Sequence, residues 1–196
     1  MQFGVGYDGA KSLKNSKLIN YQTLLNNLAK IETTSRRVFA IDGVAGSGKT
    51  TLALQLQSDI PESQVVHMDD LYSGWKDPLS QDLTKRVCDE ILNPFLKGHE
   101  VIYRKFNWHQ NVFDEAIKVA PTQTLLLEGV GAGQSAFRKM LSRIIWVEFD
   151  TESGFERVIA RDGEVVKTHM LNFLKDQNKH FSAELTNKAA DYTISG

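Results

Sequence analysis

Residues 43–50 have the residue types and the spacing of a phosphate-binding loop. The segment reads GVAGSGKT and matches the pattern G-x-x-x-x-G-K-[ST] at every fixed position. Glycines let the backbone wrap a polyphosphate, so that backbone N–H groups and the positive N-terminus of the next helix stabilise its charge. In such a P-loop, Lys49 reaches the β- and γ-phosphates and the Thr50 hydroxyl binds Mg²⁺. We therefore predict a nucleotide site made by Gly43, Val44, Ala45, Gly46, Ser47, Gly48, Lys49, Thr50 and Thr51.

The residues on either side of this loop fit the elements that it requires. Residues 38–41 are a short apolar run typical of a buried strand, and residues 51–56 are mostly good helix formers. A strand that leads through the loop into a helix is the context that supports the motif. The pattern G-x-G-x-x-G at residues 4–9 has no room for a strand before it, so we expect no dinucleotide site there.

The composition narrows the class of protein. The 196 residues suffice for one well-buried α/β core, and we predict a flexible N-terminal arm at 1–16 and a single domain at 17–196. The formal net charge of −1 provides no basic surface for nucleic acid or an acidic membrane, so neither partner is expected. Cys88 is the single cysteine, and we find no long apolar span or signal-peptide pattern, which predicts a cytoplasmic protein.

Strands alternate with helices along the chain. Besides residues 38–41, strand patterns cover 64–68, 100–103, 124–128, 144–149 and 192–194, with a small extra strand at 116–119 and an aromatic and basic loop at 104–109. Helical patterns cover 18–31, 80–92, 151–160 and 168–186. This order predicts an α/β fold of three layers, a P-loop NTPase with a central, mostly parallel sheet and helices on both faces. Ligands in such folds bind at the carboxyl ends of the strands, where we expect Asp42, Asp69, Arg104 and Glu128.

The remaining motifs separate the classes of nucleotide-binding protein. No D-x-x-G segment occurs, and the nearest approach to N-K-x-D, at residues 187–191, has its aspartate one position late, which argues against a GTPase. A kinase requires a carboxylate to orient or deprotonate the acceptor hydroxyl, an acid for the metal and basic groups for the transition state. A nucleotide-binding switch protein with little turnover is the alternative.

From residue 38 to about residue 162, the chain resembles the uridine kinase and phosphoribulokinase-like P-loop kinases, of which nicotinamide riboside kinase is a close relative. The segment Asp69-Asp70-Leu71-Tyr72, after the second strand, is similar to that family's D-x-[FL]-[YF]. The resemblance implies that Asp69 faces the acceptor hydroxyl, with Asp70 as the other candidate base. A solvated turn or a helix cap is the structural alternative for both acids.

The resemblance also extends to the metal site and the lid. Glu128-Gly129 is similar to the family's E-G, whose acid helps to hold Mg²⁺, although a buried glutamate can instead serve as a structural ion-pair partner. Arg157 and Arg161 resemble the arginines of the lid that closes over the phosphates, a task that suits the planar guanidinium. A solvated helix face is the alternative for these two arginines.

The region expected to hold the acceptor departs from the family. Where uridine kinases have an aromatic-Asp-aromatic triplet, this chain has Phe106-Asn107-Trp108. These rings, with Tyr72 and Trp75, could stack on a flat or sugar-like acceptor, whereas Arg104 and Lys105 could favour an acceptor that carries a phosphate or carboxylate. Aromatic residues in such a loop can also simply cover the core. The predicted acceptor residues are Asp69, Asp70, Tyr72, Trp75, Arg104, Phe106 and Trp108.

Together these features predict an ATP-dependent, Mg²⁺-requiring kinase that transfers the γ-phosphoryl group to a hydroxyl of a nucleoside- or sugar-like metabolite. Its catalytic residues would be Lys49, Asp69, Arg157 and Arg161, and its metal residues Thr50 and Glu128. The identity of the acceptor, the preference for ATP over GTP and the oligomeric state, with a homodimer as one option, stay open.

Overall fold

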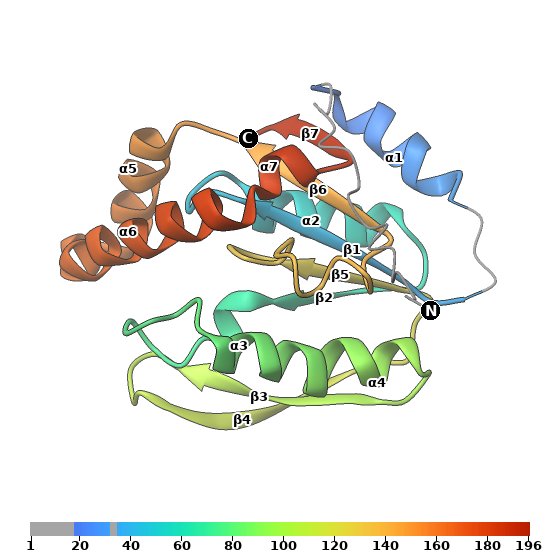
Figure 1. Cartoon of the computed structure of the whole chain (residues 1–196), viewed down its shortest axis with the longest axis horizontal. Helices are drawn as coiled ribbons and strands as arrows, with labels where there is room; N and C mark the ends of the chain where they lie inside the picture. Colours follow the sequence, from blue (N-terminus) through green and yellow to red (C-terminus); the bar gives the residue numbers. More distant parts are fainter. Residues whose placement is uncertain (1–17, 32–34) are drawn as a thin grey trace, which may run out of the picture.

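The computed structural model of the protein describes residues 18–31 and 35–196 (Figure 1). The arm predicted at 1–16 and the glycine pattern at 4–9 lie outside these residues. The predicted helix at 18–31 is shorter in the structure, where α1 spans Tyr21–Ala29 and begins after Asn20, whose side chain accepts a hydrogen bond from the Thr23 N–H.

A five-stranded sheet forms the centre of the molecule, in the strand order β2-β5-β1-β6-β7, and every pairing in it is parallel. Parallel neighbours must be joined by crossovers, which explains why helices separate the strands in the sequence. The sheet confirms the predicted fold class. Its strands are β1 (Arg37–Gly43), β2 (Ser63–His67), β5 (Thr124–Glu128), β6 (Arg143–Glu148) and β7 (Tyr192–Ser195).

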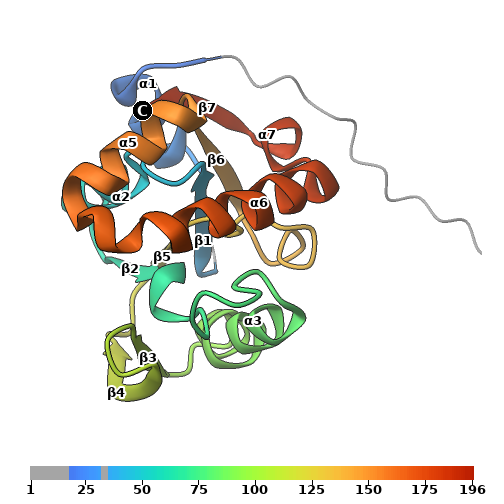
Figure 2. The same ribbon diagram turned by 90° about the vertical axis from the view of Figure 1, so that its left-hand side faces the viewer.

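Helices cover both faces of this sheet (Figures 1 and 2). Among the described residues, no helix combines the length and the apolar character needed to cross a membrane. After α1 the helical elements are α2 (Lys49–Asp59), the short η1 (Met68–Asp70), α3 (Gln81–Arg86), the π-helical η2 (Val87–Leu92), α4 (Asn93–Leu96), α5 (Thr151–Asp162), η3 (Glu164–Val166), α6 (Lys167–Glu184) and α7 (Thr186–Ala189).

Alternate residues of each central strand point to opposite faces and join two separate cores. In β1, Phe39 and Ile41 pack with α1 and α2, whereas Val38 and Ala40 pack with the helices of the other face. The strand β5 divides in the same way. Burial on both sides explains why these strands read as continuous apolar runs in the sequence.

The strand expected at 100–103 does not join the parallel sheet. It belongs to β3 (Val101–Asn107), which pairs antiparallel with β4 (Val112–Val119) in a separate two-stranded sheet. Residues 104–107, expected in a loop, continue this strand, and the small strand expected at 116–119 is the end of β4. The Asn107 side chain forms the turn by accepting hydrogen bonds from the N–H groups of His109 and Gln110. The prediction that Arg104 lies at the carboxyl edge of the sheet was therefore wrong.

The P-loop is in close contact with the first turn of α5. A Cβ atom on Gly46 would lie 2.1 Å from the backbone oxygen of Gly154, and a Cβ atom on Gly154 would lie 2.3 Å from the backbone oxygen of Ala45. Both distances are far below van der Waals contact, so only glycines allow the two backbones to approach this closely.

Gly154→Ala is expected to lower the free energy of unfolding by about 1–2 kcal/mol. In an ordinary helix the same change stabilises by roughly 1 kcal/mol, but here overpacking against a backbone oxygen opposes that gain. Denaturant titration measures the effect, with Glu156→Ala on the same helix as a control that shifts stability by less than about 0.5 kcal/mol. A stabilised Gly154→Ala protein would show that the contact is absent.

Candidate nucleotide and acceptor site

The P-loop connects β1 to α2, as its sequence context predicts. Gly48 is the N-cap of α2 and has a φ of 89°, a backbone conformation that glycine adopts readily. Residues Gly43, Val44, Ser47 and Lys49 are buried, whereas Thr50 and Thr51 are exposed on the first turn of the helix. The loop thus presents backbone N–H groups at a helix N-terminus, the usual binding site for a phosphate.

Lys49 lies at the centre of a group of carboxylates. Its ammonium is buried and donates a hydrogen bond to the Val44 carbonyl oxygen at 2.8 Å. Burial lowers the pKa of Lys49, and the negative charges of Glu128, Asp42 and Asp69 oppose that effect. Three elements that are far apart in the sequence therefore bring their acids to one ammonium group.

Glu128 lies at the end of β5 and contacts the P-loop helix. The Thr50 hydroxyl donates to its Oε2 at 3.3 Å, and the imidazole Nδ1 of His67 lies 2.7 Å from the same oxygen. A hydroxyl beside a carboxylate is an oxygen-only set, which suits Mg²⁺ because that ion takes one or two protein ligands and completes its shell with water and phosphate. The residues present therefore fit the metal that the P-loop implies, although the described residues include no cluster of three or more His, Cys, Asp or Glu suited to a metal.

His67 was missed by the sequence analysis. The register of β2 on β5 places it directly opposite Glu128, and their hydrogen bond raises the pKa of His67, against the effect of burial. The position of a histidine at the end of the neighbouring strand was the available signal, but its use required the strand order.

The two acids that follow β2 have different surroundings. Asp70 Oδ1 lies 3.1 Å from the Lys105 ammonium, and its Oδ2 accepts from the Tyr103 hydroxyl at 3.2 Å. The Asp69 side chain is exposed and receives no hydrogen bond from the described residues. Although the residue as a whole is exposed, protein atoms around its carboxylate desolvate it and Glu128 repels its charge. Both effects raise the pKa of Asp69, and Lys49 has the opposite effect. Of the two acids, Asp69 is thus the one whose carboxylate has no partner among the described residues.

Arg157 and Arg161, the two arginines predicted for a lid, both lie on α5 but have different partners. The Arg161 guanidinium makes two hydrogen bonds of 2.7 Å to Asp162, and its charge acts on both Lys49 and Asp69. The Arg157 guanidinium lies 3.8 Å from the centre of the Phe149 ring. Arg161 is therefore close enough to the site for its charge to affect Lys49 and Asp69, whereas Arg157 stacks on Phe149.

Of the predicted acceptor residues, the two tryptophans lie near Asp69. Trp108 donates from Nε1 to the Asp69 carbonyl oxygen at 3.2 Å, and its ring centre is 4.7 Å from that of Trp75. Trp75 in turn stacks on His169 of α6 at 5.1 Å with an interplanar angle of 15°. These rings join the loop after η1, the hairpin of β3 and β4, and α6 into one aromatic cluster.

Three other predicted acceptor residues lie elsewhere than the sequence suggested. Tyr72 is 1% exposed and donates from its hydroxyl to the Val130 carbonyl oxygen at 2.8 Å, and Phe106 is 3% exposed. Both rings pack in the interior, in accord with the alternative that aromatic residues cover the core. Arg104 is exposed in the middle of β3, where it donates to the Asp114 carbonyl oxygen at 3.0 Å.

Asp42 organises the backbone around the P-loop. Its fully buried carboxylate accepts hydrogen bonds from the N–H groups of Gly43, Gly131 and Gly133 at 2.8, 3.1 and 2.9 Å. Burial raises its pKa to about 6, against the effect of these N–H groups and of Lys49. Asp42 thereby ties the start of the P-loop to the segment that follows Glu128.

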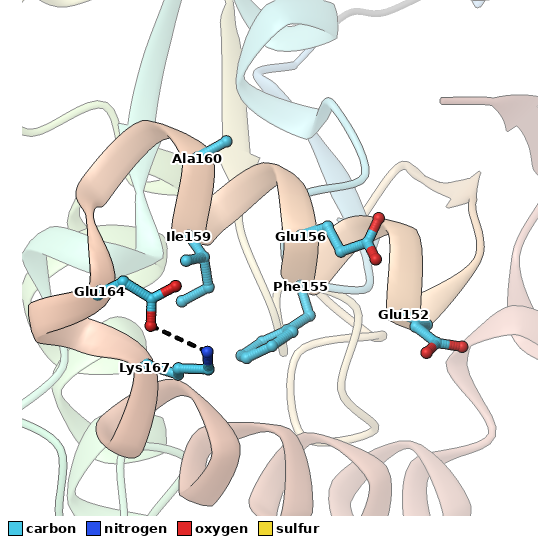
Figure 3. A pocket seen from close by; sticks show the side chains of 7 residues that line it. All are labelled: Glu152, Phe155, Glu156, Ile159, Ala160, Glu164 and Lys167. Atoms are coloured by element: carbon cyan, nitrogen blue, oxygen red, sulfur yellow. Dashed lines mark hydrogen bonds and ion pairs between the residues drawn. The ribbon is translucent and has the colours of Figure 1, made fainter.

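A surface hollow of about 430 Å³ lies apart from this chemistry, between α5 and the start of α6 (Figure 3). Apolar side chains and three glutamates surround it, together with Lys167, which pairs with Glu164 at 2.9 Å. Such acidic surroundings do not suit a phosphate. The lining residues, none of which was predicted for the site, are Glu152, Phe155, Glu156, Ile159, Ala160, Glu164 and Lys167.

Solved structures of low sequence identity share this architecture. A protein described as a possible uridine kinase, from Bacillus stearothermophilus, superposes with a TM-score of 0.68 and 18% identity over 88% of this chain and 96% of its own. A candidate fructose transport system kinase from Silicibacter sp. TM1040 has a TM-score of 0.61 and 17% identity over 91% and 99% of the two chains. A candidate P-loop kinase from Saccharomyces cerevisiae, with a circular permutation, has a TM-score of 0.51 and 12% identity over 91% and 99%.

The chain has the fold of P-loop kinases. This confirms the predicted resemblance at the level of the fold, and nucleotide binding follows from the P-loop that the fold presents. The sequence itself matches the viral superfamily 1 RNA helicase core domain over residues 39–128, less than half of the chain. That match runs from β1 through the P-loop to Glu128. No curated protein matches the chain.

Lys49→Ala is expected to weaken ATP binding about 10- to 100-fold. The change removes a charge-assisted hydrogen bond to phosphate, worth roughly 1.5–3 kcal/mol, and leaves three carboxylates without their central cation. Calorimetric titration with ATP measures the loss, and Lys97→Ala, at an exposed position on another helix end, serves as the control. Unchanged affinity in Lys49→Ala would remove this residue from the nucleotide site.

Proposed function

We propose that the protein is an ATP-dependent kinase that transfers the γ-phosphoryl group to a hydroxyl of a small nucleoside- or sugar-like metabolite in the cytoplasm. The observation that supports this most directly is the position of Asp69. An exposed carboxylate without a side-chain partner lies at a strand end, within electrostatic reach of the P-loop lysine. A nucleotide switch has no need of a free acid at this place.

The chemistry divides among the residues as phosphoryl transfer requires. Asp69 takes the proton of the acceptor hydroxyl, whose oxygen forms a bond to the γ-phosphorus while the bond to the β–γ bridging oxygen breaks and ADP leaves. Lys49, the P-loop N–H groups and Arg161 stabilise the charge on the phosphoryl oxygens. The Trp108 indole holds the backbone of Asp69 through its hydrogen bond to the carbonyl oxygen.

Thr50 and Glu128 are the residues that would hold Mg²⁺, which neutralises phosphate charge when bound. The hydrogen bond from His67 fixes the orientation of the Glu128 carboxylate, as partners of metal-binding carboxylates do.

The aromatic cluster supports an acceptor with a flat or sugar-like body. Trp75 and Trp108 lie beside Asp69, and the faces of such rings bind planar groups and the apolar faces of sugars. Arg104 is remote in β3, and Lys105 is paired with Asp70, so neither basic side chain favours an acceptor that already carries a phosphate.

A screen for ADP release tests the proposed function. The purified protein, with ATP and Mg²⁺, is incubated with nucleosides, sugars, sugar phosphates, pantothenate and other vitamin-like alcohols. We expect release above the hydrolysis background with a nucleoside or an unphosphorylated sugar-like alcohol. Tight ATP binding without release for any acceptor would favour the switch protein, and release only with sugar phosphates would refute the proposed acceptor class.

Asp69→Asn is expected to reduce transfer at least about 100-fold and to leave ATP affinity within about threefold, since general base catalysis contributes roughly 10²–10⁴. Asp70→Asn is the matched control, and its main effect is on stability through the contacts with Lys105 and Tyr103. In the native protein, transfer falls as the pH drops through the pKa of Asp69, because protonation removes the base. This pKa lies above the ordinary aspartate value. Retained transfer in Asp69→Asn with loss in Asp70→Asn would move the base to Asp70.

A further inference from the structure

Gln177 is a fully buried polar residue on α6. It follows Phe173 by four residues and Met170 by seven, which places it on the same side of the helix, and these two side chains pack in the core. Figure 2 shows α6 passing over β1, and the Gln177 side chain reaches the P-loop that follows this strand. Further along, the same face carries His180 and Glu184, so Gln177 marks the change from apolar to polar side chains on it.

The glutamine binds one end of a P-loop peptide group whose other end binds Lys49. Gln177 Oε1 accepts from the Ala45 N–H at 2.8 Å, and the Lys49 ammonium donates to the Val44 carbonyl oxygen at 2.8 Å. This N–H and this carbonyl belong to the same peptide bond, and in a trans peptide they point in opposite directions. The peptide group between Val44 and Ala45 is therefore clamped from both sides.

The two ends of the Gln177 amide have different partners. Because the Ala45 N–H requires an acceptor, the amide oxygen of Gln177 must face the loop, which directs its nitrogen away. That nitrogen, Nε2, is enclosed and has no hydrogen-bond acceptor among the described residues. A methionine of similar length would remove this unsatisfied donor but would leave the Ala45 N–H without an acceptor. The glutamine thus has a destabilising half and a half that holds the P-loop.

We propose that Gln177 is a positioning residue for phosphoryl transfer, which sets the orientation of the peptide group between Val44 and Ala45 and thereby the position of Lys49. This inference rests on the proposed function for its kinetic consequences. Held by Gln177, the peptide directs its carbonyl toward Lys49 and keeps the ammonium next to the phosphate-binding N–H groups. Without an acceptor at position 177, this peptide group would lose one of its two fixed ends.

Substitutions that keep or remove the oxygen acceptor test the proposal. Gln177→Met preserves length but removes the acceptor, whereas Gln177→Glu keeps an oxygen acceptor whether or not it is ionised. In Gln177→Met we expect kcat and ATP affinity to fall about 5- to 10-fold, the effect of one hydrogen bond, with KM for the acceptor unchanged. In Gln177→Glu we expect both to lie within about threefold of the native values. Asn178→Leu, an exposed neighbour on α6, is the control.

Each outcome of this comparison is decisive. Native kcat and ATP affinity in Gln177→Met overturn the proposal. A Gln177→Glu protein as impaired as Gln177→Met also overturns it, because the loss would then not depend on the oxygen acceptor at this position. ATP affinity is measured by calorimetry without an acceptor, so a failure of the proposed kinase activity is distinguishable from a failure of the clamp.

Amide hydrogen exchange in the native protein gives a test that needs no variant. The hydrogen bond to Gln177 predicts that the Ala45 N–H exchanges at least about tenfold more slowly than an unprotected amide. Should this N–H exchange at the unprotected rate, the clamp does not form and the proposal fails even if Gln177→Met does not fold.

Discussion

The buried ammonium of Lys49 is the feature on which the site depends. A cation removed from water is stable only if opposite charges and acceptors surround it, and here they come from the ends of β1, η1 and β5. Burial raises the pKa of Asp42 and of Asp69, and the positive charge of Lys49 opposes that effect at both. Attraction between Lys49 and these acids therefore adds to the backbone hydrogen bonds of the sheet in holding the strand ends together. The acids differ in their other contacts. Asp42 accepts hydrogen bonds from backbone N–H groups, whereas Asp69 is an exposed residue without a side-chain partner among the described residues.

Much of this arrangement could be predicted from the sequence because it depends on residues that are contiguous or at strand ends. The P-loop is a single segment whose geometry follows from its own glycines and from the strand and helix beside it. Asp69 and Glu128 follow apolar runs, and parallel strands place their carboxyl ends at one edge, so both acids were expected near the phosphates. The fold class followed from the alternation of strands and helices for the same reason.

Other features could not be predicted because they depend on pairings between distant residues. The contact of His67 with Glu128 requires the neighbourhood of β2 and β5, and that of Gln177 with Ala45 joins residues 132 positions apart. The strand at 101–107 was placed in the wrong sheet because a strand pattern does not name its partner. Arg157 and Arg161 share a helix, yet Arg157 stacks on Phe149 whereas Arg161 pairs with Asp162. Tyr72 and Phe106 were expected in open loops, but aromatic rings at such positions serve a core equally well.

The hairpin of β3 and β4 is a sheet of its own, and its turn is formed by the hydrogen bonds of Asn107 within the hairpin. Trp108 and Lys105 connect it to η1, and the buried side chains of Val101, Tyr103 and Val119 pack in the main core. Changes at its exposed positions can therefore alter what lies beside Asp69 without disturbing the register of the central sheet. An engineer can therefore vary the exposed part of the hairpin while the parallel sheet and the P-loop stay unchanged.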